Sequence, residues 1–293
     1  MIQNGDAKMI NSPIKWVGGK SRFRTQIVSL LPPHSCYVEL FAGGAWVLFA
    51  KAPSPVEILN DIDQELINFY RVLREQPQEL IESFEWEIVS RAEFERLANT
   101  DPNVMTNIQR AHRFFYLIMA GWGGEFNYPR FQTSITDGGH GNRLIGALKH
   151  LQDKLLPVHK RLQTVIIECL DWQTCYDRYN RNNVVMYIDP PYPDNKVNYY
   201  HNMRSWEEHE RLAFNLRRAQ CAWILSSYDK PEIRHLYDRN YIIPVQAFSG
   251  MVVKKGEGER VLNKEVLITN FPPPNGLAEH ILSHPQLDLG LVD

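Results

Sequence analysis

The sequence contains few cysteines and has no excess of positive charge. Only 4 of its 293 residues are cysteine, and Cys36, Cys169, Cys175 and Cys221 form no Cys-x-x-Cys pair and have no histidine at ligand spacing. We therefore expect reduced core cysteines of a cytosolic protein, and neither zinc sites nor disulfides. The formal net charge is −2. A nucleic acid partner would therefore require Lys and Arg to be segregated onto one face.

Long apolar runs and the dinucleotide-binding fingerprint are also missing. No segment is long enough to span a bilayer, and residues 1–11 contain no apolar signal region, so no membrane association is expected. The pattern Gly-x-Gly-x-x-Gly is absent, which argues against a nicotinamide-dependent dehydrogenase. Hydrophobic content of 44% and charged content of 23% are typical of a packed globular chain. Its length fits one large α/β domain or a domain with an insertion.

The most informative stretch is an apolar run that ends in Asp-Pro-Pro-Tyr. Residues Val184 to Ile188 are β-branched or otherwise large and apolar, which predicts a strand buried on both faces. Pro190 and Pro191 then fix φ and donate no backbone hydrogen bond, so the chain must leave the sheet as a stiff turn. Asp189 and Tyr192 are therefore held at the end of a central strand, where ligands of open α/β sheets bind.

These groups suit chemistry on an exocyclic amine of a nucleobase, whose lone pair is conjugated into the ring. A carboxylate and a backbone carbonyl that accept its two hydrogens would free the lone pair and stabilise developing positive charge. A flat aromatic ring would stack on the base. The alternative is that residues 189–192 form an ordinary proline turn after a core strand.

The first βα unit has the arrangement of a nucleotide-binding site. The segment Tyr37 to Ala45 predicts a strand, a tight glycine turn and a helix start, and the next strand, Val56 to Asn60, is followed by Asp61. An acidic residue roughly 20 positions after the glycines is placed to accept hydrogen bonds from ribose hydroxyls. Asp61 could also be the N-cap of a helix from Gln64 to Arg74. Upstream, Trp16-Val17-Gly18-Gly19-Lys20 offers a stacking face and a point charge.

The middle of the chain breaks the α/β pattern. Helical spacing dominates residues 77–87, 91–98 and 107–119, a glycine-rich passage covers 121–141, and a helix is predicted from Asn142 to Leu162. We predict an inserted helical subdomain. Its aromatic and basic side chains suit nucleic acid contact, although each one alone fits a solvated helix face. They are Arg110, Arg113, Trp122, Phe126, Tyr128, Arg130, Phe131 and Arg143.

The sheet is predicted to resume after the insertion. A strand from Val165 to Glu168 is followed by Asp171 and Trp172, again an acid and an aromatic ring beyond a strand end. Residues 193–202 form a polar, tyrosine-rich loop long enough to act as a lid. Ser205 and Glu208 predict a capping box, with the helix running to about Ala219. Further strands are predicted at 222–227, 241–248 and 265–269. The glycine-rich link 250–263 carries Lys254 and Lys255 and predicts a phosphate-contacting hairpin.

Several motifs in one order resemble the Dam-like, D12-class DNA adenine-N6 methyltransferases over nearly the full length. The matching segments are Lys15–Lys20, Glu39–Gly44, Asn60–Asp63, Gly124–Pro129, Asp189–Tyr192 and Asn263–Ile268. Their order, with the cofactor motifs first and the Asp-Pro-Pro-Tyr motif late, is that of the α-group of this family. The resemblance implies an α/β fold: a Rossmann-like S-adenosylmethionine-dependent methyltransferase sheet with an inserted, mainly helical target-recognition subdomain.

The resemblance also implies the division of the chain and the roles of its residues. Residues 1–75 and 160–272 would form the catalytic domain, 76–159 the DNA-recognition subdomain and 273–293 a tail. The cofactor site would be lined by Trp16, Lys20, Phe41, Gly43, Asp61, Asp171, Trp172 and Asp189. The catalytic residues would be Asp189, Pro190, Pro191 and Tyr192. The DNA-binding residues would be Phe126, Asn127, Arg130, Tyr199, Lys254 and Lys255.

Double-stranded DNA and S-adenosylmethionine are thus the implied partners, in the cytoplasm of a bacterial or phage-infected cell. No metal and no oligomerisation would be required. The methyl group would pass directly to N6 of an adenine flipped out of the duplex and held by Asp189 and the Pro190 carbonyl. Unstacking a base costs a few kcal/mol, which the new contacts offset.

Two departures from the family pattern stand out. Ala45 replaces a glycine that many members carry in the first turn. Members that read GATC carry a longer basic and aromatic hairpin before the Phe-Asn-x-Pro segment, whereas here residues 118–125 separate Leu117 from Phe126 and contain no basic side chain. Because base sequence is read by side chains on base edges, we expect relaxed or very short specificity, as in some phage-encoded relatives.

Rival interpretations remain at this stage. The same tetrapeptide acts on other conjugated amino groups, so the substrate could be RNA adenine or a protein glutamine amide. The chain could also be a DNA-binding regulator without activity, although all expected catalytic positions are filled. The inserted helical region and the match along the whole chain favour DNA.

Overall fold

The computed structural model describes residues 9–122, 129–133, 142–193, 203, 205–248 and 262–274, with backbone alone at 246–248 and 262–263. Its strands are β1 (Cys36–Glu39), β2 (Val56–Asn60), β3 (Val165–Glu168), β4 (Val184–Ile188), β5 (Ala222–Tyr228), β6 (Tyr241–Phe248) and β7 (Leu262–Thr269). They form one seven-stranded sheet in the order β3-β2-β1-β4-β5-β7-β6. All pairs are parallel except those that β7 makes with β5 and β6. The predicted α/β, methyltransferase-type fold is confirmed, and its sheet is mixed.

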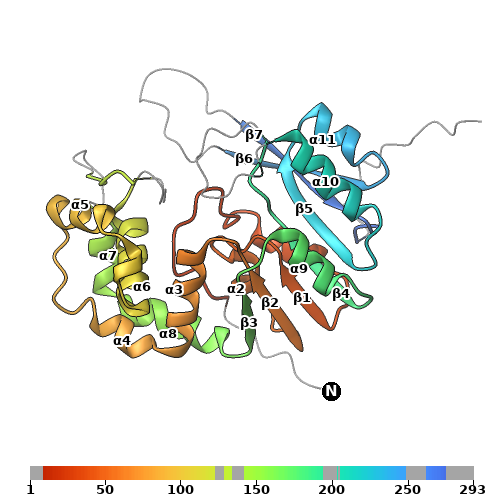
Figure 1. Ribbon diagram of the computed structural model, residues 1–293. Helices are drawn as coiled ribbons and strands as arrows, with labels where there is room; N and C mark the ends of the chain where they lie inside the picture. Colours follow the sequence, from red (N-terminus) through yellow and green to blue (C-terminus); the bar gives the residue numbers. More distant parts are fainter. Residues whose placement is uncertain are drawn as a thin grey trace, which may run out of the picture.

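Helices cover both faces of this sheet (Figure 1). The described helices are α1 (Arg24–Leu30), α2 (Trp46–Ala50), α3 (Gln64–Glu75), α4 (Pro77–Glu82), α5 (Arg91–Asn99), η1 (Pro102–Val104), α6 (Asn107–Ala120), α7 (Arg143–Lys149), α8 (Leu151–Leu162), α9 (Trp172–Tyr179), α10 (Trp206–Leu216) and α11 (Pro231–Leu236). One core cluster joins α1, α2, α3, α6 and α8 to one face of the strands. A second joins α9, α10 and α11 to the other face. The strands are therefore buried on both sides, as their apolar runs predict.

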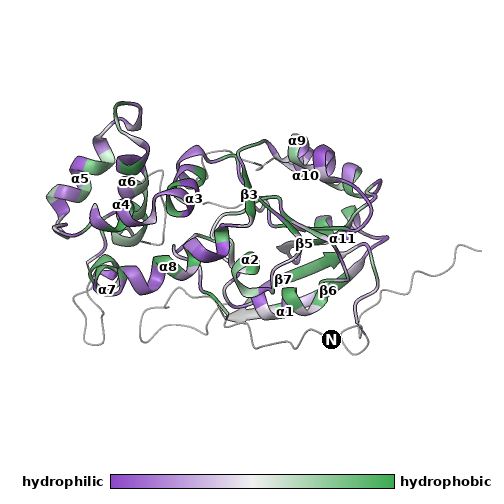
Figure 2. Cartoon of the chain, turned by 90° about the horizontal axis from the view of Figure 1, so that it is seen from below, coloured by the Kyte–Doolittle hydropathy of each residue, from purple (hydrophilic) through white to green (hydrophobic). Residues whose placement is uncertain are grey.

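Figure 2 shows the same division by hydropathy: apolar residues concentrate on the strands, and polar residues on the outer helix surfaces. Strand β4 is fully buried along its length, as expected for the strand before Asp189. No helix among the described residues is long and apolar enough to cross a membrane.

The described elements between β2 and β3 are helical. Figure 1 places α4 to α7 together at one side, with α3 and α8 between them and the strands. Helix α6 has a complete capping box, in which Thr106 accepts from the Gln109 backbone and Gln109 accepts from the Thr106 backbone. The division into a catalytic domain and a recognition subdomain stays a prediction.

Two predicted helices differ in extent. The single helix expected from Asn142 to Leu162 is interrupted at His150, whose φ of −130° and ψ of 32° are not helical. The interruption lets α7 pack on α6 while α8 packs on α3 and α4. The helix expected to reach Glu87 ends at Glu82, and turns follow. In both cases tertiary packing overrides local helical spacing.

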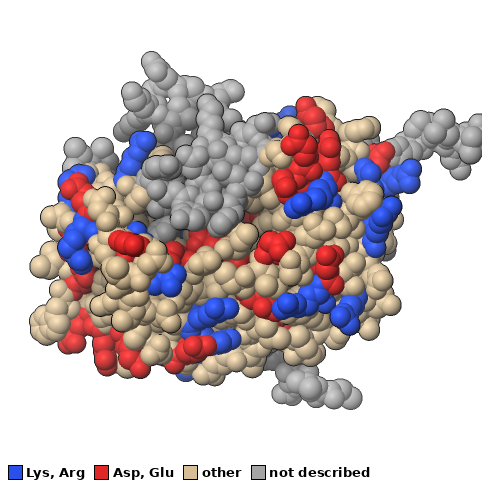
Figure 3. Space-filling model, viewed as in Figure 1, with Lys and Arg blue, Asp and Glu red and all other residues tan. Residues whose placement is uncertain are grey.

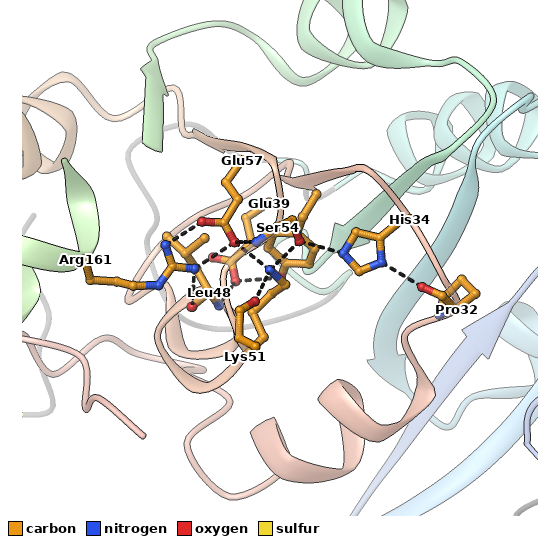
Figure 4. A network of polar contacts seen from close by, with 10 residues as sticks. Pro32, His34, Glu39, Leu48, Lys51, Ser54, Glu57 and Arg161 are labelled. Atoms are coloured by element: carbon orange, nitrogen blue, oxygen red, sulfur yellow. Dashed lines mark hydrogen bonds and ion pairs between the residues drawn. The ribbon is translucent and has the colours of Figure 1, made fainter. Parts of the chain in front are cut away.

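A buried ion cluster fastens α2 and α8 to the start of β2. We use this name for Lys51, Glu57 and Arg161. The Glu57 carboxylate accepts from Lys51 Nζ at 2.5 Å and from Arg161 Nη2 at 2.7 Å, and Arg161 Nη1 donates to its other oxygen. Figure 4 shows the network continuing through Ser54 to His34, whose Nδ1 donates to the Pro32 carbonyl. No sequence motif indicated this cluster.

Candidate active site

The motif residues converge where the strand order reverses. Strands β1 and β4 are neighbours at the centre of the sheet, and their chains continue in opposite directions along it, through β2 and β5. Parallel strands end at the same edge, so the segments after Glu39, Asn60, Glu168 and Ile188 lie together. Asn60 holds three of these ends in place, because its amide group donates to the Leu40 and Leu170 carbonyls and accepts from Leu170 N.

Gly43 forms the turn after β1 and has no room for a side chain. Its φ is +45°, and a Cβ there would lie 2.7 Å from the Trp16 ring. Gly43 N donates to Asp61 Oδ2 at 2.9 Å, and Tyr70 Oη donates to the Gly43 carbonyl at 2.9 Å. Trp16 also packs on Phe114 of α6, with ring centroids 6.3 Å apart. The turn is thus fixed from both sides.

Ala45, the departure from the family's glycine pattern, lies in the left-handed region with φ 50° and ψ 36°. This conformation explains why glycine would suit the position. The residue is nevertheless buried at the start of α2, where its carbonyl accepts from Phe49 N.

Asp61 does not cap α3, so that alternative is wrong. The N-cap is Asp63, whose carboxylate accepts from Glu65 N and Leu66 N. Asp61 instead accepts from Gly43 N and from Asp63 N, and burial raises its pKa above the ordinary value. Burial and the neighbouring Asp61 charge raise the pKa of Asp63 to about 6. Asp61 therefore couples the end of β2 to the glycine turn.

Asp171 and Trp172 begin α9 at the end of β3. The Asp171 carboxylate caps the helix by accepting from Gln173 N and Thr174 N, and it also accepts from the Thr174 hydroxyl. Its pKa is lowered, mainly by the Thr174 hydrogen bond. Trp172 is buried, and its Nε1 has no hydrogen-bond partner in the described part of the chain. Phe41 packs, partly buried, on the same face of the sheet.

Asp189 receives two donors on one oxygen. Lys20 Nζ lies 2.8 Å from Oδ1, and Ser226 Oγ donates to the same atom at 2.7 Å. Among the described residues no hydrogen bond reaches Oδ2, and the side chain is 18% exposed. The carboxylate therefore has one occupied oxygen and one that is open to a ligand.

Lys20 lies between two carboxylates and beside an aromatic ring. It is 4.0 Å from Glu265 Oε2 and 4.9 Å from the Tyr192 ring centroid, and it donates to the Gly18 carbonyl. Tyr192 Oη donates to Glu265 Oε2 at 3.2 Å, and the Tyr228 ring packs edge-on at 4.5 Å. The Tyr192 ring is only 6% exposed. Burial raises the pKa of Glu265, opposed by the charge of Lys20.

The Pro190-Pro191 turn is held by a buried histidine. His209 Nε2 lies 3.1 Å from the Pro191 carbonyl and 2.9 Å from the Met203 carbonyl, so this nitrogen carries the proton and donates. The Pro190 carbonyl has no hydrogen-bond partner among the described residues. It is therefore available to a ligand, one residue after Asp189.

Sequence patterns missed four residues of this site: His209, Ser226, Tyr228 and Glu265. Ser226 and Tyr228 are on β5, and Glu265 lies opposite Tyr228 on β7. The strands themselves were predicted, but their pairing was not, and only the pairing brings these side chains to Asp189. Glu265 had one available signal, because it belongs to the motif Asn263–Ile268.

The predicted DNA contacts are largely outside the described residues. Five of the six lie there: Phe126, Asn127, Tyr199, Lys254 and Lys255. Arg130 is described and exposed. Figure 3 shows the face of the molecule seen in Figure 1. The described Lys and Arg side chains on this face form small groups among acidic ones, and acidic side chains gather over α10 and α11. The expected single basic face is not seen in this view.

Comparison with known proteins identifies the family. The sequence model of the D12 class N6 adenine-specific DNA methyltransferases matches residues 16–251. The chain is 25% identical over 276 residues to the type II methyltransferase M1.LlaDCHI of Lactococcus lactis, covering 88% of this chain and 94% of that protein. It is 27% identical over 289 residues to the type II methyltransferase M.MjaIII of Methanocaldococcus jannaschii, covering 88% of this chain and 98% of that protein.

A DNA adenine methylase of Haemophilus influenzae is 25% identical over 193 residues, covering 61% of this chain and 63% of that protein. Because the family model spans most of the chain, the protein belongs to the D12 class of N6 adenine-specific DNA methyltransferases, which are S-adenosylmethionine-dependent enzymes.

Proposed function

We propose that the enzyme methylates N6 of an adenine flipped out of duplex DNA, with Asp189 Oδ2 and the Pro190 carbonyl accepting the two amine hydrogens. The observation that carries this proposal is the Asp189 carboxylate, which has one oxygen occupied by Lys20 and Ser226 and the other without a hydrogen-bond partner among the described residues. Two acceptors on the amine favour pyramidal nitrogen and release its lone pair. The negative carboxylate also stabilises the positive charge that develops on N6.

The residues at the strand ends suit the cofactor chemically. Asp61 and Asp171 offer carboxylates beyond β2 and β3, and Gly43 holds the turn that ties Asp61 and Trp16 together at this edge. Buried Trp172 Nε1 is a donor without a protein partner in the described region. We propose that Trp16, Lys20, Phe41, Gly43, Asp61, Asp171, Trp172 and Asp189 line the site. When bound there, S-adenosylmethionine supplies the electrophilic methyl group.

Tyr192 is proposed to stack on the flipped adenine. The Lys20 ammonium lies over its ring and Tyr228 packs edge-on against it. Since the ring is 6% exposed, stacking requires the contacts around it to rearrange when DNA binds. Pro191 would keep the turn in place through its contact with His209.

We further propose that residues 76–159 form the DNA-recognition subdomain and that Phe126, Asn127, Arg130, Tyr199, Lys254 and Lys255 contact DNA. Stacking side chains and basic side chains are what such contacts need. No metal and no second subunit is required by this chemistry.

Relaxed or very short sequence specificity is the expected behaviour on DNA. The stretch between α6 and Phe126 has no basic side chain to read base edges. Plasmid from cells that produce the protein is therefore expected to resist several nucleases whose sites hold adenine in different contexts. Protection at one site and no other would contradict this prediction, and a catalytically inactive variant serves as the control.

The function itself is tested with labelled S-adenosylmethionine and unmodified duplex DNA, followed by nucleoside digestion and mass spectrometry. N6-methyladenine is the expected product, and the fraction of adenines modified at saturation reports specificity. Label in RNA or protein with none in DNA would overturn the proposed substrate. Absence of transfer to all three would favour a binding protein without activity.

Replacing Gly43 by alanine is expected to weaken S-adenosylmethionine binding by about 10-fold or more. A left-handed backbone costs alanine about 1–2 kcal/mol, and the new Cβ would press on Trp16. Calorimetric titration of the cofactor measures the effect. Gly146→Ala is the matched control, since among the described residues nothing beyond its chain neighbours and the backbone of its own helix lies within 4 Å of its Cβ position. In helix α7 this change is expected to stabilise the protein by about 0.5–1 kcal/mol and to leave binding unchanged.

A further inference from the structure

Ser226 is brought to Asp189 by the register of two parallel strands. Ile188 of β4 pairs with Leu225 of β5, so the next positions along each strand are Asp189 and Ser226. Tyr187, two residues before Asp189, faces the same side, and its hydroxyl lies 3.0 Å from Ser226 Oγ. Ser226 is 1% exposed. A buried hydroxyl is thus placed between a buried phenol and the catalytic carboxylate.

The hydrogen bonds between these groups have a defined direction. An ionised carboxylate only accepts, so the single Ser226 proton goes to Asp189 Oδ1, 2.7 Å away. The Tyr187 phenol must then donate to Ser226 Oγ. Burial raises the pKa of Tyr187 well above its ordinary value, so the phenol keeps its proton at neutral pH. The chain therefore runs from Tyr187 through Ser226 to Asp189.

Lys20 alone would not fix the plane of the carboxylate. Its ammonium ion ends a flexible side chain and lies between Asp189 and Glu265, at 2.8 and 4.0 Å. A point charge attracts a carboxylate without defining its rotation. Ser226 belongs to a central strand and is itself held by Tyr187, so it fixes the position of Oδ1 and leaves Oδ2 without a partner among the described residues.

We propose that Ser226, held by Tyr187, is a positioning residue that orients the Asp189 carboxylate so that Oδ2 alone accepts from the substrate amine. This inference rests on the proposed role of Asp189. It assigns a function to a serine on β5 that no motif indicated. It also explains why Oδ1 collects both donors while Oδ2 has none among the described residues.

Ser226→Ala is expected to lower kcat roughly 10- to 100-fold, as loss of one hydrogen bond to a charged group would. KM for DNA and the Kd for S-adenosylmethionine are expected to stay unchanged, because Ser226 is buried and its hydroxyl hydrogen-bonds to Asp189 and Tyr187.

Ser227→Ala is the matched control. Ser227 is the next residue on the same strand, is 2% exposed, and its Oγ has no partner among the described residues. Its removal is expected to leave kcat unchanged. Tyr187→Phe removes only the outer hydroxyl, and we expect a smaller fall in kcat, again with no change in KM for DNA. This variant also tests the inference if Ser226→Ala does not fold.

The inference is overturned if Ser226→Ala and Tyr187→Phe both fold and keep the wild-type kcat. It is also overturned if Ser227→Ala lowers kcat as much as Ser226→Ala, since the effect would then be one of packing. Failure of the proposed function is a separate result. In that case the wild-type protein forms no N6-methyladenine, whereas failure of the inference leaves an active enzyme that needs Asp189 but not Ser226.

Discussion

Replacing Asp189 by asparagine is expected to lower kcat for methyl transfer by about 10³-fold, nearly as much as replacement by alanine. Asparagine has the same shape as aspartate. The expected fall in kcat therefore comes from the lost negative charge and from the changed direction of the hydrogen bonds. Lys20 and Ser226 both donate to Oδ1, and the side-chain amide would keep its oxygen there. Its NH₂ group would then replace Oδ2 and face the NH₂ group of adenine, donor against donor.

Single-turnover methyl transfer on duplex DNA measures this effect, with circular dichroism and thermal unfolding measured separately to detect misfolding. Asp229→Asn is a suitable control, because Asp229 follows the adjacent strand β5 but is held by Arg234 at 2.6 and 3.0 Å. Its kcat is expected to change little. If Asp189→Asn kept most of the wild-type kcat, neither the charge of the carboxylate nor the orientation of Oδ2 would be what activates the amine.

The positions that the sequence predicts well are those where a strand ends. Asp61, Asp171 and Asp189 each follow an apolar run, and parallel strands bring such ends to one edge whatever their order. The backbone alone places them, so linear spacing is sufficient. Gly43 is similar, since a tight turn directly after a strand leaves few alternatives to glycine.

The contacts that depend on strand pairing could not be predicted in the same way. Ser226 reaches Asp189 only because β5 is beside β4, and Glu265 reaches Tyr192 only because β7 inserts antiparallel between β5 and β6. A different cause explains the error at Asp61. Asp63 directly precedes Gln64, the first residue of α3, and therefore takes the N-cap, whereas Asp61 accepts from Gly43 N and Asp63 N.

Replacing Arg161 by leucine is expected to lower the free energy of unfolding by about 3–5 kcal/mol, because it leaves a buried carboxylate without its main partner. Glu57 is 1% exposed and Arg161 8%. The guanidinium donates to both Glu57 oxygens and to the Leu48 carbonyl, so its loss affects β2, α2 and α8 together. Lys51 would remain as the only cation of the cluster.

Urea unfolding at pH 7 measures this loss as a lower midpoint at unchanged slope. Arg178→Leu is the control, since its ion pair with Glu168 is at the surface and its removal is expected to matter far less. A small loss at Arg161 would mean that Lys51 alone can neutralise Glu57.

The pH dependence gives a second test of the same cluster. Burial would raise the pKa of Glu57, but the hydrogen bonds and charges of Arg161 and Lys51 outweigh it and the pKa is lowered below 4.5. A carboxyl group with a lowered folded-state pKa stabilises the protein above its unfolded pKa and loses that contribution as pH falls through the folded value. Wild-type stability should therefore decline below about pH 4.5 in part through Glu57. In Arg161→Leu the part of the acid-induced loss of stability that comes from Glu57 should be smaller, because the Glu57 carboxylate has already lost the partner that favoured its charged form.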